Sequence, residues 1–391
     1  MANTDLLEVA RTWSHWDSPP NPSTPRSVEL PSSLSPGIAL VVQGVRRCGK
    51  STLLAQLMAR YSLDPEACLF INFEDPRLAG VLEHSTLQEL VDGFEEKIGG
   101  GGTYFLDEIQ VVDGWESWLR MQLDRGHDRR FVVTGSNARL LSGELGSKLT
   151  GRHLRVELFP FDLAEYRELI PNASVETYLE SGGFPAPIQS SDRDLLLRAY
   201  FGDIVERDMR ERVGARSTRP LRQLVQMVFE SAGSELSARR IAAAIGVSTD
   251  TAGLYLDAAE SAYLLFPCPY FAWSERKRLA RNKKFYPIDT GLRRVSVTRT
   301  GNDLGKALEC ATFLELRRRF DQVYYWKGRG EVDFVVEQNG APIPIQVTWN
   351  GPTERHRAAI DEFQEEHPQA REAVFVTPED FDLGMPELHA N

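Results

Sequence analysis

The sequence lacks any long apolar segment, has few cysteines and carries no surplus of positive charge. Its longest apolar runs have the length of a strand, so no segment is expected to cross a bilayer. The first residues include acidic side chains and show no apolar core of a signal peptide. The cysteines lack metal-ligand spacing, and reduced thiols in a cytoplasm are their simplest explanation. They are Cys48, Cys68, Cys268 and Cys310. These absences predict a cytoplasmic protein with no membrane partner.

Charge and length set the broad class of the protein. The 391 residues include 45 lysines and arginines against 56 aspartates and glutamates, a formal net charge of −11. This acidic balance argues against a protein coated all over by nucleic acid, but it is compatible with a local basic groove. Hydrophobic residues make up 42% and charged residues 26% of the chain, as in soluble globular proteins. A chain of this length is expected to form two or three domains.

The most informative stretch is residues 44–51, which has the Walker A spacing. An apolar run at 38–42 precedes it and predicts a buried strand, and residues 52–58 predict a helix. Gly44 and Gly49 would let the backbone wrap a phosphate with its N–H groups, and the helix would point its positive end at the anion. The predicted nucleotide-binding residues are Gly44, Val45, Arg46, Arg47, Cys48, Gly49, Lys50, Ser51 and Thr52.

An acidic pair supplies the second half of such a site. Asp107 and Glu108 directly follow the apolar run 104–106, which predicts another buried strand. Lys50 is expected to reach the β- and γ-phosphates, and the oxygens of Ser51 and Asp107 are expected to hold Mg²⁺. Glu108 is expected to orient and polarise the attacking water. The sequence therefore predicts a site for ATP and Mg²⁺.

Two further catalytic candidates follow a third apolar strand. Ser136, or alternatively Thr134 or Asn137, could hydrogen-bond the γ-phosphate or the attacking water, because it lies at the C-terminal end of that strand. A short polar helix is expected over 138–148. After it comes Arg152, which stands where an oligomeric ATPase presents an arginine finger to the neighbouring subunit. A finger would be worth ~10³–10⁵ in rate, and the alternative is a solvated surface arginine.

Together with these motifs, further stretches fit one family pattern. The matching stretches are Gly44–Leu54, Asn72–Arg77, Phe105–Gln110, Trp115–Glu116, Thr134–Ser136, Leu149–Arg152, Pro160–Phe161, Gly182–Pro185, Asp203–Asp208 and Phe285–Leu292. In these stretches the chain resembles bacterial and archaeal AAA+ ATPases that carry a C-terminal domain of uncharacterised function. The resemblance implies an AAA+ module, helices with a winged-helix element, a domain similar to PD-(D/E)xK nucleases, and assembly into a homo-oligomer.

The expected fold class is α/β, with alternating strands and helices that predict a parallel sheet. Beyond this AAA+ P-loop domain we expect a helical winged-helix region and a small α/β nuclease-like domain. The predicted borders are 1–37 for an N-terminal helix and linker, 38–165 for the ATPase, 166–284 for the helical region and 285–391 for the nuclease-like domain. Within the helical region, 236–248 and 249–261 predict a helix-turn-helix. Its second helix carries no Arg or Lys, which favours docking over base reading.

The nuclease-like domain has only part of a metal site. The resemblance implies one Glu on a helix, an Asp that opens the central strand, and a Glu-x-Lys on the next strand. Glu309 and Asp333 match the first two, whereas Gln346 and Thr348 replace the third pair. Phosphodiester cleavage needs anionic oxygens around hard cations and a cation or base beside the water. The site is predicted not to cut, although Lys327 could take the place of the missing lysine.

The densest basic run, Arg276–Lys284, is the expected contact for DNA or RNA, and a solvated face is the alternative.

Taken together, the sequence predicts an AAA+ ATPase that hydrolyses ATP as a switch or motor acting on nucleic acid or a nucleoprotein complex. Two alternatives stay open. One is a nuclease gated by ATP, and the other is a nucleotide-dependent signalling switch that docks a protein partner.

Overall fold

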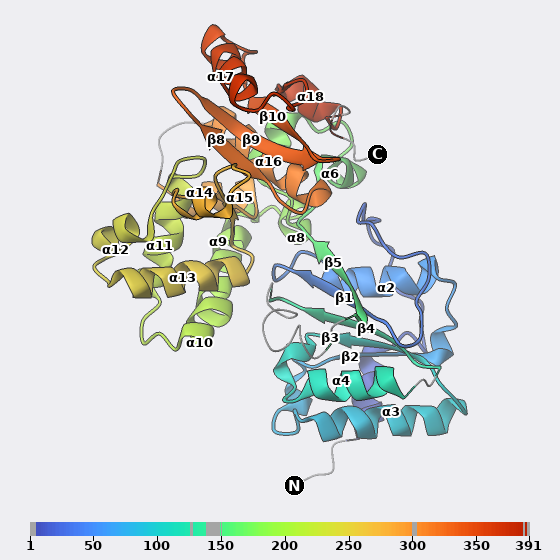
Figure 1. Cartoon of the computed structure of the whole chain (residues 1–391). Coiled ribbons are helices and arrows are strands. Elements are labelled where there is room, and N and C mark those ends of the chain that lie inside the picture. Colours follow the sequence, from blue (N-terminus) through green and yellow to red (C-terminus); the bar gives the residue numbers. More distant parts are fainter. Residues whose placement is uncertain are drawn as a thin grey trace. The chain divides into compact units, whose positions relative to one another are not determined.

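The computed structural model describes residues 5–125, 128–137, 149, 151–298, 303–385 and 388. The chain forms two compact units, Met1–Leu158 and Phe159–Asn391 (Figure 1). The short polar helix expected over 138–148 lies outside the described residues. Within the described part of the chain, no helix is both long and apolar enough to span a membrane.

The first unit is built on a five-stranded parallel sheet with the order β2-β3-β4-β1-β5. The strands are β1 (Ala39–Gly44), β2 (Cys68–Asn72), β3 (Thr103–Asp107), β4 (Arg130–Gly135) and β5 (His153–Leu158). The three central strands are buried along nearly their whole length. Such near-continuous apolar runs are typical of parallel strands with helices on both faces. The expected α/β class with a parallel sheet is confirmed.

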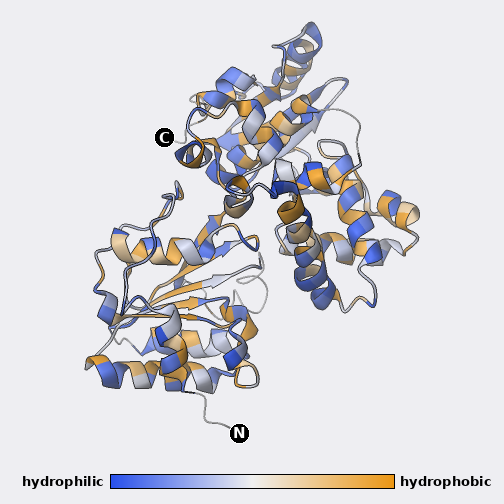
Figure 2. Cartoon of the chain, turned by 180° about the vertical axis from the view of Figure 1, so that it is seen from behind, coloured by the Kyte–Doolittle hydropathy of each residue, from blue (hydrophilic) through white to orange (hydrophobic). Residues whose placement is uncertain are grey.

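Helices cover both faces of this sheet. They are α1 (Leu6–Trp13), α2 (Lys50–Arg60), α3 (His84–Ile98) and α4 (Trp115–Asp124), with short 3₁₀ turns η1 (Pro65–Ala67), η2 (Pro76–Leu78) and η3 (Ile109–Val111). Helix α2 lies on one face, and α3 and α4 lie on the other (Figure 1). The apolar residues follow the strands and the inner sides of the helices (Figure 2). This packing fixes the C-terminal ends of β1, β3 and β4 at one edge of the sheet.

The second unit begins with a run of helices. They are α6 (Leu163–Leu169), α7 (Val175–Ser181), α8 (Pro185–Ile188), α9 (Arg193–Asp203), a π-helical turn η4 (Ile204–Met209), α10 (Arg210–Val213), α11 (Arg219–Glu230), α12 (Ala238–Ile245) and α13 (Thr249–Ser261). Gly246 ends α12 with a φ of +73°, and α13 starts three residues later. The expected helix–turn–helix order is therefore present. An antiparallel pair, β6 (Leu265–Cys268) and β7 (Lys284–Pro287), follows it and encloses α14 (Glu275–Leu279).

The rest of this unit is a mixed four-stranded sheet with the order β11-β10-β9-β8. Its strands are β8 (Tyr324–Lys327), β9 (Glu331–Gln338), β10 (Ala341–Val347) and β11 (Val374–Val376). Its helices are α15 (Thr290–Ser296), α16 (Leu304–Arg319), α17 (Glu354–Glu366) and α18 (Pro378–Asp382). Helix α16 contacts β9 and β10, so this long and largely buried helix packs on the sheet.

Two distant glycine-containing stretches meet inside the second unit. The carboxylate of Asp289 accepts the backbone N–H of Gly183 at 2.6 Å and that of Leu292 at 2.6 Å. A Cβ on Gly182 would lie 2.2 Å from Asp289 Oδ1, and a Cβ on Gly291 would lie 2.2 Å from the Ser181 carbonyl oxygen. Burial raises the pKa of Asp289 to about 6. Side chains at Gly182 and Gly291 would not fit. This gives a structural reason for the glycines in the family-like stretches Gly182–Pro185 and Phe285–Leu292.

Candidate functional site

The loop between β1 and α2 has the backbone that its glycines predict. A Cβ on Gly44 would lie 2.2 Å from the Leu158 carbonyl oxygen, so only glycine fits beside β5. Gly49 has a φ of +101°, which other residues rarely adopt. Helix α2 follows directly, and no side chain caps its N-terminus. The first N–H groups of α2 are therefore available to an anion, as the Walker A spacing requires.

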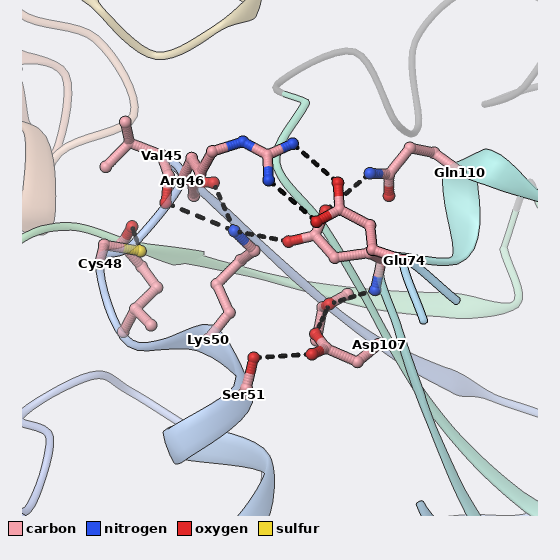
Figure 3. A network of polar contacts seen from close by, with 12 residues as sticks. Val45, Arg46, Cys48, Lys50, Ser51, Glu74, Asp107 and Gln110 are labelled. Atoms are coloured by element: carbon pink, nitrogen blue, oxygen red, sulfur yellow. Dashed lines mark hydrogen bonds and ion pairs between the residues drawn. The ribbon is translucent and has the colours of Figure 1, made fainter. Parts of the chain in front are cut away.

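Lys50 points back into this loop (Figure 3). Its Nζ donates to the carbonyl oxygens of Gly44 at 3.2 Å and Val45 at 3.4 Å, and it lies 3.2 Å from Glu108 Oε1. The lysine is 4% exposed. Burial alone would lower its pKa, but the Glu108 carboxylate gives a net upward shift. Lys50 is therefore held charged at the position where the phosphates of a nucleotide would be expected.

Asp107 and Ser51 bring two oxygens together at the end of β3. Ser51 Oγ donates to Asp107 Oδ2 at 2.6 Å, and Asn72 Nδ2 donates to the same oxygen at 2.9 Å. Thr134 Oγ1 donates to the other carboxylate oxygen. Burial and then the charge of Glu108 raise the pKa of Asp107. A hydroxyl and a carboxylate with hard oxygen atoms are suitable ligands for Mg²⁺, so these residues fit the predicted metal.

Glu108 has an unusual backbone and three polar neighbours. Its φ is +54°, a left-handed conformation that few non-glycine residues adopt. Gln110 Nε2 donates to Glu108 Oε2 at 2.7 Å, and the Glu108 N–H donates to Thr134 Oγ1 at 3.0 Å. Burial would raise the pKa of Glu108, but Lys50, Gln110 and Arg46 lower it overall. The carboxylate is thus kept ionised, as a group that polarises water must be.

The candidates after β4 separate into different environments. Thr134 is already bonded to both members of the acidic pair, so it positions Asp107 and Glu108. Ser136 is buried directly after the end of β4, at the same edge as the loop. A role for Ser136 at the γ-phosphate stays a prediction.

Arg152 lies at the N-terminal ends of the strands, whereas the loop between β1 and α2 lies at their C-terminal ends. It precedes β5, whose first residue pairs with Ala39 at the start of β1, whereas Gly44 pairs with Leu158. A strand rises roughly 3.3 Å per residue, which puts about 16 Å between the two edges. Arg152 Nη2 lies 2.7 Å from Asp124, and Nη1 donates to the Leu123 carbonyl at 3.2 Å. It cannot reach the loop of its own subunit, so a finger role remains a prediction for a neighbouring subunit.

Three polar residues of this site were not predicted as site residues. Asn72 and Gln110 hold the acidic pair, and Glu74 forms a two-pronged ion pair with Arg46 in the loop. A signal was present, because Asn72 and Glu74 belong to a family-like stretch at the end of a predicted strand. Neighbouring parallel strands end at one edge, so that stretch had to lie near the acidic pair.

A pocket of ≈ 420 Å³ adjoins Ser51 and Asp107, the predicted ligands of Mg²⁺. Its lining combines Ser51, Asp107 and Asn72 with the N-terminal segment, including Trp13 and His15. Pro20, Asn21, Pro22 and Ser23 also line it, so part of the predicted linker lies beside the site. Farther along that linker, Arg26 Nη1 donates to the Cys48 carbonyl at 2.9 Å.

The nuclease-like residues also come together. Gln346 Nε2 and the Val347 N–H donate to Asp333 Oδ2 at 2.6 and 2.9 Å. Tyr286 OH donates to Glu309 Oε1 at 2.7 Å. Burial and then the Glu309 charge raise the pKa of Asp333 to about 8. Among the described residues, no group of three His, Cys, Asp or Glu side chains could hold a metal ion.

The structure bears on two lysines named in the sequence analysis. Lys327, the alternative to the missing lysine, pairs with Glu235 at 3.0 Å and Glu331 at 3.5 Å. Lys284 is not an accessible part of the basic run, because it is 1% exposed and bonds Glu331 at 2.6 Å. Burial alone would lower the pKa of Lys284, but Glu309, Glu331 and Asp333 raise it.

Comparison with known proteins agrees with this geometry. A family model described as an AAA domain matches residues 37–167. The chain is 30% identical over 341 residues to an uncharacterized protein of Methanocaldococcus jannaschii, covering 80% of this chain and 74% of that relative. The chain belongs to a family of AAA-type P-loop ATPases. Two models for domains of unknown function (DUF8612 and DUF4143) match residues 172–303 and 304–390 of this chain.

Two further matches are a second uncharacterized relative and a solved structure. An uncharacterized protein of Haemophilus influenzae is 29% identical over 340 residues, covering 81% of the ATPase and 84% of the relative. The crystal structure of Cdc6p from Pyrobaculum aerophilum is 13% identical, with a TM-score of 0.27, and covers 59% of this chain and 82% of that one. A likeness this remote supports no further conclusion.

Proposed function

We propose that this ATPase binds ATP with Mg²⁺ and hydrolyses it as a conformational switch or motor. The proposal rests on the convergence of four side chains at one edge of the sheet. Lys50 Nζ lies 3.2 Å from Glu108, and Ser51 Oγ lies 2.6 Å from Asp107. Assembly into a homo-oligomer and a cytoplasmic location belong to the same proposal.

The residues divide the work of hydrolysis. The loop N–H groups and Lys50 would bind the phosphates, and Ser51 and Asp107 would hold Mg²⁺, which when bound neutralises phosphate charge. Glu108 would accept a hydrogen bond from the attacking water. Gln110 holds the Glu108 side chain, and Thr134 holds the Glu108 backbone. Ser136 would contact the γ-phosphate from the end of β4.

The test is ATP turnover by the purified protein with and without DNA or RNA, with the assembly mass measured in each nucleotide state. Stimulation by nucleic acid would support a motor or switch acting on it. A change of assembly with nucleotide and no affinity for nucleic acid would instead favour the signalling switch. Absence of ATP hydrolysis in every condition would reject the proposal.

Nucleic acid would be bound through the exposed part of the run Arg276–Lys284. Arg276, Lys277 and Lys283 are exposed, whereas Arg278 is tied to Tyr324 and Glu275. Such contacts would go mostly to phosphates, so binding should depend weakly on sequence and fall steeply with salt. The helix–turn–helix of α12 and α13 would serve docking.

Replacing Arg276, Lys277 and Lys283 together by glutamine is expected to weaken DNA binding about uniformly over different sequences. The slope of log affinity against log salt should flatten by about 1 for each phosphate that the variant no longer neutralises. Fluorescence anisotropy over a salt series measures both effects. The matched control replaces three exposed arginines elsewhere in the unit, Arg216, Arg219 and Arg355. Equal affinity of the two variants would show that the run is only a solvated face.

The second candidate function is a nuclease gated by ATP. The observation that favours it is Lys284, whose charge interacts with Glu309 and Asp333 although the expected lysine position is Thr348. Against it, the Lys284 ammonium donates to Glu331, and Gln346 supplies only a neutral amide. A neutral oxygen binds Mg²⁺ less well than a carboxylate and lowers the pKa of bound water less. We therefore propose that the domain holds partners and does not cut.

The protein is expected to leave single- and double-stranded DNA and RNA intact in Mg²⁺ and in Mn²⁺, with and without ATP. Gel analysis of end-labelled substrates is the measurement, with Asp333→Ala tested beside the parent protein. Cleavage by the parent that disappears in Asp333→Ala would establish the gated nuclease. Cleavage that persists in the variant would indicate a contaminant.

A further inference from the structure

Two cationic side chains of the P-loop, Lys50 and Arg46, are paired with carboxylates. Lys50 contacts Glu108 at 3.2 Å, and Arg46 makes a fork to Glu74 with contacts of 3.0 and 2.8 Å (Figure 3). Glu74 comes two residues after β2, the strand next to β3. The Arg46–Glu74 pair therefore joins the phosphate loop to the edge that also carries the acidic pair.

The two partners of this pair differ in their access to water. The Arg46 side chain is 14% exposed and that of Glu74 is 34% exposed. If the pair separates, Glu74 can regain water at little cost, whereas Arg46 would remain a largely buried charge, which favours the approach of another anion. Glu74 is thus the partner that can leave, and Arg46 is the one that stays in the site.

An arginine fork that fits a carboxylate also fits a phosphate, because both present two oxygens in one plane to parallel N–H donors. Arg46 follows Val45, whose carbonyl oxygen accepts from Lys50, so the two cations lie at the same end of the loop (Figure 3). Lys50 is the expected contact of the β- and γ-phosphates. A terminal phosphate bound by Lys50 would therefore lie near Arg46 as well.

We propose that Arg46 is a second phosphate-binding cation of this site, and that Glu74 is a built-in counter-ion which the terminal phosphate of a nucleoside triphosphate displaces. This inference rests on the proposed ATP binding. It assigns Arg46 a specificity role, since a diphosphate lacks the group that would displace Glu74. Glu74 would then act through Arg46, as a positioning residue that competes with the ligand.

The test is the affinity of the full chain for a non-hydrolysable ATP analogue and for ADP, both with Mg²⁺. Arg46→Gln should weaken binding of the analogue about 10- to 100-fold, the usual range for a charge-assisted hydrogen bond, and binding of ADP less than about threefold. Arg46→Lys keeps the charge without the fork, and should recover part of the affinity. Glu74→Gln should tighten the analogue about three- to tenfold, because the competing anion is gone.

The two changes should not be additive. In an Arg46→Gln background, Glu74→Gln should have no further effect, because the counter-ion then has no cation to neutralise. The exposed residues Arg125 and Glu66, each changed to glutamine, are controls for the same changes of charge. Thermal unfolding without nucleotide identifies any variant that fails to fold.

Four outcomes would overturn the inference. Weaker analogue binding by Glu74→Gln would make the pair a structural support, and equal weakening for the analogue and ADP would remove the terminal phosphate as the contact. Unchanged binding by Arg46→Gln in a parent that binds ATP would reject the inference alone. A parent protein that binds neither nucleotide would reject the proposed function as well.

Discussion

Replacing Glu108 by glutamine is expected to leave ATP bound and to slow its hydrolysis by about 10²–10⁴-fold, the usual contribution of a general base. The amide keeps the shape of the side chain but cannot take up charge from the attacking water. It also removes the anion paired with Lys50, so affinity for ATP should not fall. Single-turnover hydrolysis and equilibrium binding, measured on one preparation, separate the two effects.

Lys50→Ala is the complementary change. It removes a buried cation that donates to two loop carbonyls, and it should weaken ATP binding by about 10- to 100-fold, as expected for a charged contact.

Glu116→Gln, which changes an acidic residue of α4 outside the site, serves as the control for Glu108→Gln. Hydrolysis at the parent rate by Glu108→Gln would show that another group acts on the water.

Mixing two inactive variants is expected to restore ATP hydrolysis. Arg152→Ala should lose about 10³–10⁵ in rate if this arginine completes a neighbour's site. Lys50→Ala subunits bind ATP weakly but still offer Arg152, so mixed assemblies contain some complete sites. Specific activity of the parent should likewise rise with protein concentration. Steady-state turnover across mixing ratios is the measurement.

The structure offers a matched control for this mixing experiment. Arg152 pairs with Asp124, and both side chains are about two-fifths exposed, at 40% and 42%. Such exposed pairs contribute about 0–1 kcal/mol to stability, so Asp124→Asn should lose little activity. If Asp124→Asn lost as much activity as Arg152→Ala, the arginine would be a support within its own subunit. Turnover by a monomer at every concentration would also exclude the finger.

Sequence was sufficient for the ATPase sheet because local patterns determine it. Strands β1 to β4 are mostly apolar runs, and the glycines of the loop are required by a positive φ or a close backbone approach, so they stand out along the chain. The acidic pair follows directly from the strand before it. Nothing local, however, shows that Glu74 reaches back to Arg46 across the sheet edge.

Lys284 illustrates the opposite case, in which a local pattern misleads. It ends a run of basic residues and so resembles its exposed neighbours in sequence. In the structure it begins β7, where its side chain turns inward and meets Glu331, 47 residues later. Charge patterning cannot predict a partner at that separation. The same holds for Arg152, whose side chain is bound to the end of α4.

The contact between Asp289 and Gly183 also sets an order of events in time. The two residues are 106 positions apart, and at about 5–20 residues per second the ribosome would take roughly 5–20 s to make the intervening chain. Until then the Gly183 N–H cannot donate to Asp289. The contact at Gly183 therefore forms only after a residue beyond the predicted border at 284 has been made.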